Sequence, residues 1–456
     1  IPVHLGSMAY AMRDIVNRVT WTAGDTLVFN DPYLGGTHLP DVTLVSPVFV
    51  DGELQAFVAN RAHHADIGAE SPGSMPVSTS LMQEGLVLEP DFLIRNGEWN
   101  SALRQKIIGS ARKPDESLGD FSAQVSANMA GLQRLQTLIA KMQGDSFSRA
   151  VDALNAYGES LARQMLAKIP DGEYRFSDLL DDDGIGDSGI LLRLLLTVDG
   201  EGCHLDFTGT AAQVGGNVNC PLSVTAAGVF YVFRCLMPPQ TPACAGIFRP
   251  ISLYAPEGTL LNALFPAAVA AGNVETSTRV VDLVCGALAQ AIPDSMPAAS
   301  HGSMNNLAMG VNGEQAWDYY ETIGGGMGSG RNGGGLSAVQ THMTNTRNTP
   351  VEVLESHFPI RVESYAIRHD SGGEGRRRGG DGIVRTFRFL DNARFTLLTE
   401  RRHNAPWGLG SGGNGKPGRN LLNGQEIPAK CEKEVAAGDL LTIETAGGGG
   451  WGPSRE

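Results

Sequence analysis

The sequence predicts an α+β fold, in which mixed β-sheets accompany a helical hairpin near 117–169 and a glycine-rich, strand-dominated C-terminal part. Short apolar runs between turn residues fill the start of the chain, a helical period then takes over, and short strands with glycine turns follow from about residue 350. We therefore divide the chain into a β-rich region 1–116, a helical hairpin 117–172, an α/β central region 173–345 and a β-rich region 346–456.

The first region contains a β-hairpin with a clear turn signal. Residues 42–50 and 53–59 are apolar runs of strand length, and Asp51-Gly52 between them is a dipeptide that favours a tight hairpin turn. Residues 26–29 are typical of a further strand, because turn residues follow them directly. The region 1–116 is therefore predicted to be rich in strands.

Two long helices are predicted next. Apolar residues recur at intervals of three and four through 121–139 and again through 147–165, which we interpret as a helical hairpin. Farther along, residues 191–198 are typical of a strand, and the segments 221–236 and 276–292 are apolar enough to form buried helices.

Composition excludes some classes of partner. The formal net charge is −14, whereas nucleic acids and anionic membranes both favour clustered Lys and Arg, so we expect neither as a partner. The 58 glycines are nearly twice the usual share of about 7%, which indicates many tight turns. The six cysteines form no CxxC pair and fit no zinc motif, so we expect reduced thiols and a cytoplasmic location.

Potential metal ligands lie directly before and directly after the predicted hairpin in the sequence. His38 and Asp41 precede its first strand, and His63, His64 and Asp66 follow its second. An antiparallel hairpin returns the chain to its starting point, so these groups are expected to meet. Imidazole nitrogens with carboxylate oxygens suit Zn, Mn, Fe or Ni, and a mixed set leaves positions open for a water or a carbonyl oxygen.

Spacing alone leaves an alternative open, because His and Asp residues in loops are often simply solvated. Adjacent residues of a regular strand face opposite sides, so His63 and His64 cannot both point at one metal, and one of them is expected to be structural.

Other polar features are less specific. The glycine-rich segment 323–335 lacks the phosphate-binding pattern GxxxxGK[ST], and we interpret it as tight turns. Four polar residues next to apolar runs are candidates to line a pocket that the sequence cannot place: Asn273, Glu275, Asn305 and Asn306.

The segment Asn30-Asp-Pro-Tyr-Leu-Gly-Gly-Thr-His-Leu-Pro-Asp41 resembles the signature of the hydantoinase B family, which includes the B subunits of N-methylhydantoinases, the C-terminal half of 5-oxoprolinases and a large subunit of acetone carboxylases. Further similar motifs follow in the same order as in the family: 59–68, 72–75, 272–277, 341–346, 361–365, 371–375, 405–408 and the final Gly-Gly-Gly-Gly-Trp-Gly. The resemblance therefore covers nearly the whole chain, although Ala69 stands where the family usually has a second glycine.

The resemblance implies a site and a chemistry. It places a divalent metal (Zn, Mn or Fe) at His38, Asp41 and His63, with His63 preferred to His64 by its place in the motif. Asp66 or His64 would then orient a ligand or move a proton in catalysis. Family members usually begin well upstream, in some with a further acidic metal ligand, so we expect the chain to be truncated or processed at its N-terminus.

The resemblance also implies a partner. An A-type subunit would hold ATP and phosphorylate the substrate oxygen, and this chain would act with it as a hetero-oligomer that hydrolyses a hydantoin, 5-oxoproline or a related lactam. Two alternatives stay open: a subunit of a ketone carboxylase similar to acetone carboxylase, and a non-catalytic assembly subunit.

Overall fold

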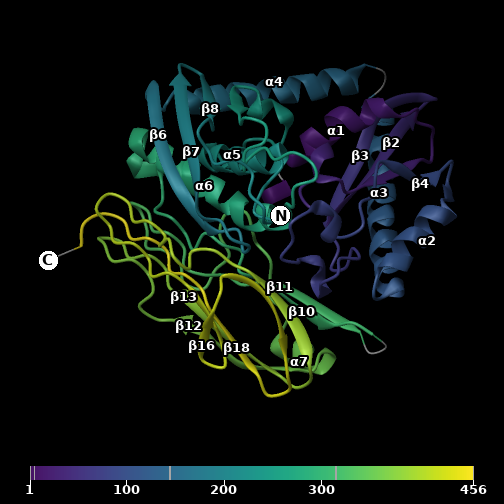
Figure 1. Cartoon of the computed structure of the whole chain (residues 1–456). Helices are drawn as coiled ribbons and strands as arrows, with labels where there is room; N and C mark the ends of the chain where they lie inside the picture. The colour runs from purple at the N-terminus through teal and green to yellow at the C-terminus, as the bar shows by residue number, and fades with distance from the viewer. Residues whose placement is uncertain (1, 5, 143–144, 314–315, 455–456) are drawn as a thin grey trace.

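The fold was analysed in a computed structural model, which describes residues 2–4, 6–142, 145–313 and 316–454. It contains four sheets flanked by helices, and this confirms the predicted α+β class. Figure 1 shows an N-terminal unit, a central unit and a C-terminal unit arranged around the N-terminus of the chain. No helix within the described residues is both long and apolar enough to cross a bilayer.

The N-terminal unit is a five-stranded antiparallel sheet in the order β3-β2-β1-β4-β5. It comprises η1 (Pro2–His4), α1 (Ser7–Arg18), β1 (Thr26–Phe29), η2 (Pro32–Leu34), β2 (Asp41–Val50), β3 (Glu53–His63), β4 (Asp91–Arg95), β5 (Glu98–Trp99), α2 (Ser101–Ser110) and α3 (Pro114–Met142). The predicted hairpin is confirmed as β2 and β3, and Asp51 and Gly52 at its turn both have the positive φ that a tight hairpin turn requires.

This sheet buries both of its faces. Successive side chains of a strand point to opposite sides, so Val28 of β1 packs in the core with Phe121 of α3, whereas Leu27 packs with Ile15 of α1. The hairpin that carries the candidate ligands is therefore held between α3 and α1.

The central unit is the sheet β6-β7-β8-β9 with buried helices against it. It comprises α4 (Ser146–Leu166), β6 (Gly172–Asp182), β7 (Ser188–Asp199), β8 (Gly202–Asp206), α5 (Leu222–Leu236), η5 (Ala245–Phe248), β9 (Ile251–Tyr254), a π-helical turn η6 (Gly272–Thr276) and α6 (Ser277–Ala291). The predicted strand at 191–198 and the two predicted buried helices are thus present as β7, α5 and α6.

The two helices predicted at 117–169 are present as α3 and α4, but they do not pack along one another. Helix α3 packs on β2 and β3, whereas α4 packs on η5 and β8 of the central unit. Figure 1 shows them running in different directions, so they link two units instead of forming a closed hairpin.

The C-terminal unit consists of two sheets, β11-β10-β14-β17 and β12-β13-β18-β15-β16, which share one apolar core. Its elements are β10 (Asn306–Val311), β11 (Trp317–Thr322), α7 (Val351–His357), β12 (Ile360–Arg368), β13 (Gly382–Phe389), β14 (Ala393–Leu398), β15 (Arg419–Leu422), β16 (Gln425–Ile427), β17 (Lys430–Val435) and β18 (Leu440–Glu444). This strand-dominated part agrees with the prediction.

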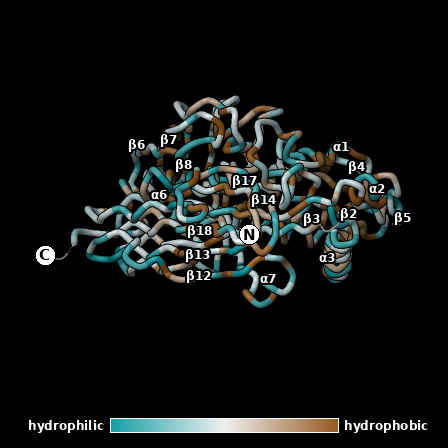
Figure 2. The backbone as a smooth tube through the Cα atoms, turned by 60° about the horizontal axis from the view of Figure 1, so that its bottom comes forward, coloured by the Kyte–Doolittle hydropathy of each residue, from teal (hydrophilic) through white to brown (hydrophobic). Residues whose placement is uncertain are grey.

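Glycine-rich segments extend from these sheets and pack backbone against backbone. The amide of Gly448 donates to the carbonyl of Gly380 (2.9 Å), and Gly380 in turn donates to Met327 (2.9 Å). In Figure 2 the segments near the C-terminus are mostly pale, since glycine is neither strongly hydrophilic nor hydrophobic. The run 323–335 thus lies in close contact with other chain segments and does more than form the tight turns predicted for it.

We predict that Gly448→Ala destabilises the protein, because an added Cβ would lie 2.1 Å from the carbonyl oxygen of Met327, which is backbone and cannot move aside. Overpacking of this kind costs about 1–3 kcal/mol or more, measurable as a fall in the free energy of unfolding. Gly330→Ala is the matched control, since nothing lies within 4 Å of its Cβ. Equal stability of the two variants would contradict the close packing.

Candidate metal centre

The register of the hairpin brings the candidate ligands together. Asp41 is the first residue of β2, and its direct pairing partner is His63, the last residue of β3. His38 lies in the loop just before β2, where the Asp41 amide donates to the His38 carbonyl (3.0 Å). The buried side chain of Asn30 fastens the same loop by donating to the Leu39 carbonyl (2.8 Å).

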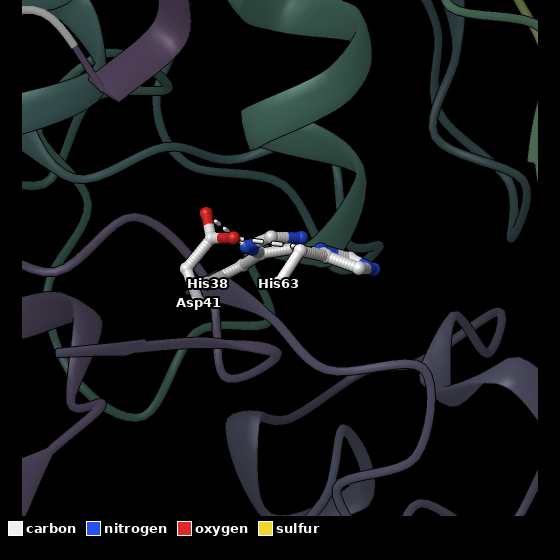
Figure 3. A group of neighbouring side chains, drawn as sticks. All are labelled: His38, Asp41 and His63. Carbon is white, nitrogen blue, oxygen red and sulfur yellow. Dashed lines mark ion pairs between the residues drawn. The ribbon is translucent and has the colours of Figure 1, made fainter. Parts of the chain in front are cut away.

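Three side chains converge at this end of the hairpin (Figure 3). Asp41 Oδ2 lies 2.9 Å from His38 Nδ1, and Asp41 Oδ1 lies 3.4 Å from His63 Nδ1. Each residue offers one ligand atom, and these atoms lie within 4.8 Å of one another. His38 and Asp41 are 1% exposed, whereas His63 is 24% exposed, so access to the group is on the His63 side.

The residues present fit a divalent cation. Asp41 Oδ1, His63 Nε2 and Asn273 Oδ1 are buried and have no hydrogen-bond partner among the described residues. Buried polar atoms without partners are costly, so such a cluster points to a ligand that satisfies them. Two imidazoles and one carboxylate form a donor set that suits Zn, Mn or Fe.

The carboxyl group of Asp41 stays ionised at this position. Burial by itself would raise its pKa, but the neighbouring rings of His38 and His4 lower the pKa well below its ordinary value. A permanently charged carboxylate among imidazoles is the form that a cation requires.

The structure adds three residues that sequence reasoning did not assign to this group. His4 of η1 places Nε2 2.9 Å from Asp41 Oδ2, and the Thr37 hydroxyl donates to the same oxygen. Asn273, in the π-helical turn η6, places its amide nitrogen 3.2 Å from His38 Nδ1. Thr37 and Asn273 lie inside quoted motifs, but nothing in the sequence singled out His4.

The π-helical turn is itself a clue to a functional site. Such turns are rare and occur frequently where a side chain must reach a ligand or an active group. Here the turn brings Asn273 to the end of a hairpin more than two hundred residues away in the sequence.

His64 points away from the group, toward α3. Its Nε2 lies 2.8 Å from Gln124 Oε1, and its ring packs against Phe121 at 4.5 Å between centroids. Burial lowers its pKa, which favours the neutral ring. The structure thus places His63, and not His64, beside Asp41.

Asp66 is engaged elsewhere. Its carboxylate forms an ion pair (2.9 Å) with Arg112, which lies in the link between α2 and α3. The carboxylate also accepts a hydrogen bond from the Gly68 amide (2.9 Å). The catalytic roles suggested for His64 and Asp66 stay predictions, and the contacts of both residues hold the loop that follows β3.

A sequence model of the hydantoinase B/oxoprolinase family matches residues 1–454. The chain belongs to this family. A 5-oxoprolinase of Dictyostelium discoideum is 37% identical over 99% of this chain, which spans only 36% of that relative. The B subunit of a putative D-/L-hydantoinase from a Pseudomonas strain is 32% identical over the whole chain, which spans 80% of it.

Two solved structures share the fold of this chain. An ATP-dependent caprolactamase from Pseudomonas jessenii matches 99% of this chain and 82% of its own chain, with a TM-score of 0.90 and 25% identity. A nucleotide-free acetone carboxylase matches 99% of this chain and 68% of its own chain, with a TM-score of 0.87 and 17% identity, and supports the fold alone.

We predict that His63→Gln abolishes tight metal binding, whereas His64→Gln retains it, because only His63 faces Asp41. Elemental analysis after loading with Zn²⁺ and removal of excess metal measures this. Metal retained by His63→Gln, or lost only from His64→Gln, would contradict the assignment.

Proposed function

We propose that this chain is the B-type subunit of an ATP-dependent cyclic amide hydrolase, which acts on a hydantoin, 5-oxoproline or a related lactam. The observation that carries the proposal is the convergence of His38, Asp41 and His63 around buried atoms that have no hydrogen-bond partner among the described residues. Three similar proteins are named for a cyclic amide substrate: a 5-oxoprolinase, a hydantoinase subunit and a caprolactamase.

The need for ATP points to a partner. An amide carbonyl resists attack, and phosphorylation of its oxygen makes the carbon electrophilic, so that water can add to it and the C–N bond of the ring can break. The sequence carries no recognisable nucleotide-binding motif, and one relative is named as a subunit. We therefore assign ATP binding and phosphorylation to an A-type partner in a hetero-oligomer.

The residues of this chain would hold the cation and the substrate. His38, Asp41 and His63 are the ligands, and the divalent cation (Zn, Mn or Fe) supplies Lewis acidity that lowers the pKa of a water or polarises an oxygen. Thr37 and His4 fix the orientation of the Asp41 carboxylate by hydrogen bonds to Oδ2. The ligand geometry would therefore be set before the substrate arrives.

Asn273 is suited to contact the substrate. Its nitrogen lies beside His38, and its Oδ1 is buried without a partner among the described residues. A carbonyl oxygen in this position accepts a hydrogen bond from the N–H of a cyclic amide. His64 and Asp66 enter the proposal as residues that hold the loop after β3, through Gln124 and Arg112.

The test is reconstitution with the A-type partner. We predict that the pair opens a hydantoin, 5-oxoproline or caprolactam ring and consumes ATP. Chromatography measures the ring-opened product, and a phosphate assay measures the phosphate released. His38→Ala should lower kcat by at least about a hundredfold, because loss of outer contacts alone costs ten- to hundredfold at metal sites.

Controls separate the alternatives. Wild-type turnover without ATP or without the partner would contradict the coupled reaction. Carboxylation of acetone with bicarbonate, in place of ring opening, would favour the carboxylase alternative. Full activity of His38→Ala would contradict the assignment of the metal site, and a wild-type chain that holds no metal would favour the non-catalytic assembly subunit.

A further inference from the structure

The ring of His63 packs on an aromatic residue from the C-terminal unit. Tyr320 of β11 stacks on it with 5.0 Å between ring centroids and 25° between planes. His63 needs such support, because it is the most exposed of the three candidate ligands and its distance to Asp41 Oδ1 is 3.4 Å. His38, in contrast, is 1% exposed and closer to the carboxylate.

The Tyr320 ring is itself tethered. Its hydroxyl donates to Asn306 Oδ1 at 2.5 Å. Asn306 of β10 pairs with Thr322 of β11, and Tyr320 lies two residues before Thr322 on β11. Asn306 and Tyr320 are therefore diagonal neighbours on the same face of the sheet.

The tether continues to a buried carboxyl group. Asn306 Nδ2 donates to Glu275 Oε1 (3.1 Å), which also accepts from the Met304 amide (3.2 Å). Glu275 is fully buried, and burial followed by the charge of Glu400 raises its pKa to about 8.

The chain of contacts starts and ends at the candidate metal centre. Glu275 and Asn273 both belong to the π-helical turn η6, and Asn273 contacts His38. Hydrogen bonds from Tyr320 to Asn306 and from Asn306 to Glu275 therefore connect the face of the His63 ring to the turn beside His38.

We propose that Tyr320 is a positioning residue that sets the orientation of the His63 ring for metal binding, and that Asn306 and Glu275 hold Tyr320 in that position. This inference rests on the proposed metal site. Tyr320 packs against the ligand and leaves its nitrogens free, so its replacement changes metal affinity and ligand geometry.

The experiment titrates the purified chain with Co²⁺ alone and measures the dissociation constant by competition with a chelator, together with the visible absorption of the bound ion. Tyr320→Phe keeps the ring and removes the tether. Tyr320→Leu removes both, and Asn306→Leu removes the acceptor from the other side. Tyr319→Phe is the matched control, because Tyr319 directly precedes Tyr320 in β11 and its hydroxyl donates to Glu321 Oε2 (2.8 Å), away from His63.

We expect Tyr320→Leu to raise the dissociation constant about ten- to hundredfold, as loss of outer contacts at metal sites does, and to alter the Co²⁺ spectrum. Tyr320→Phe and Asn306→Leu should each raise the dissociation constant by a smaller factor. The double variant that carries both changes should bind no more weakly than the weaker-binding single variant, because both changes break the same hydrogen bond. Tyr319→Phe should bind like the wild type.

Folding of each variant is checked by its melting temperature. Wild-type affinity and spectrum in folded Tyr320→Leu would overturn the inference while leaving the metal site intact. An equal loss in Tyr319→Phe would also overturn it, since the effect would then be general. If Tyr320→Leu does not fold, unchanged binding in Tyr320→Phe and Asn306→Leu overturns it. A wild type that binds no Co²⁺ overturns the proposed metal site itself.

Discussion

The antiparallel pairing of β2 with β3 is the constraint on which the site depends. It sets Asp41 directly opposite His63, and the loop before β2 adds His38 on the same side. A shift of this pairing by one residue would turn His64 toward Asp41 and His63 toward α3, because side chains alternate along a strand. The apolar contacts of β2 with α3 and of β1 with α1 hold the pairing in place.

The hairpin and the loop before it supply the three candidate ligands, and the other two units complete their surroundings. Asn273 comes from the central unit, and Tyr320 comes from the C-terminal unit. Buried ion pairs join these two units, since Glu400 contacts both Arg279 of α6 (3.2 Å) and Lys430 of β17 (2.7 Å). Removing one partner of such a pair typically costs about 3–5 kcal/mol, because it leaves an uncompensated buried charge.

The sequence was sufficient to predict what is local. Apolar runs on both sides of Asp51-Gly52 predict the hairpin, and a hairpin brings its two ends together, so the residues predict that His38 and Asp41 meet one of His63 and His64. The choice of His63 came from its place in the family motif, and the register pairs His63 with Asp41. The packing of α3 and α4 was not predictable in this way. Helical periodicity tells which face of a helix is apolar, but not which sheet covers that face.

Contributions from distant segments were missed for the same reason. His4 reaches the site through the packing of η1, and Tyr320 through the packing of the C-terminal unit; neither lies in a pattern that marks a ligand. The glycine runs indicated close turns, whereas their side-by-side packing depends on backbone contacts between segments far apart, such as Gly448 with Gly380.

We propose that His38, Asp41 and His63 hold a metal ion. Anomalous diffraction from a crystal of the metal-loaded chain, recorded above and below the absorption edge of the metal, can locate that ion. We expect one peak at about 2.0–2.2 Å from an imidazole nitrogen of each histidine and from an Asp41 oxygen. A loaded crystal with its only peak elsewhere, or with none, would contradict the proposed metal site.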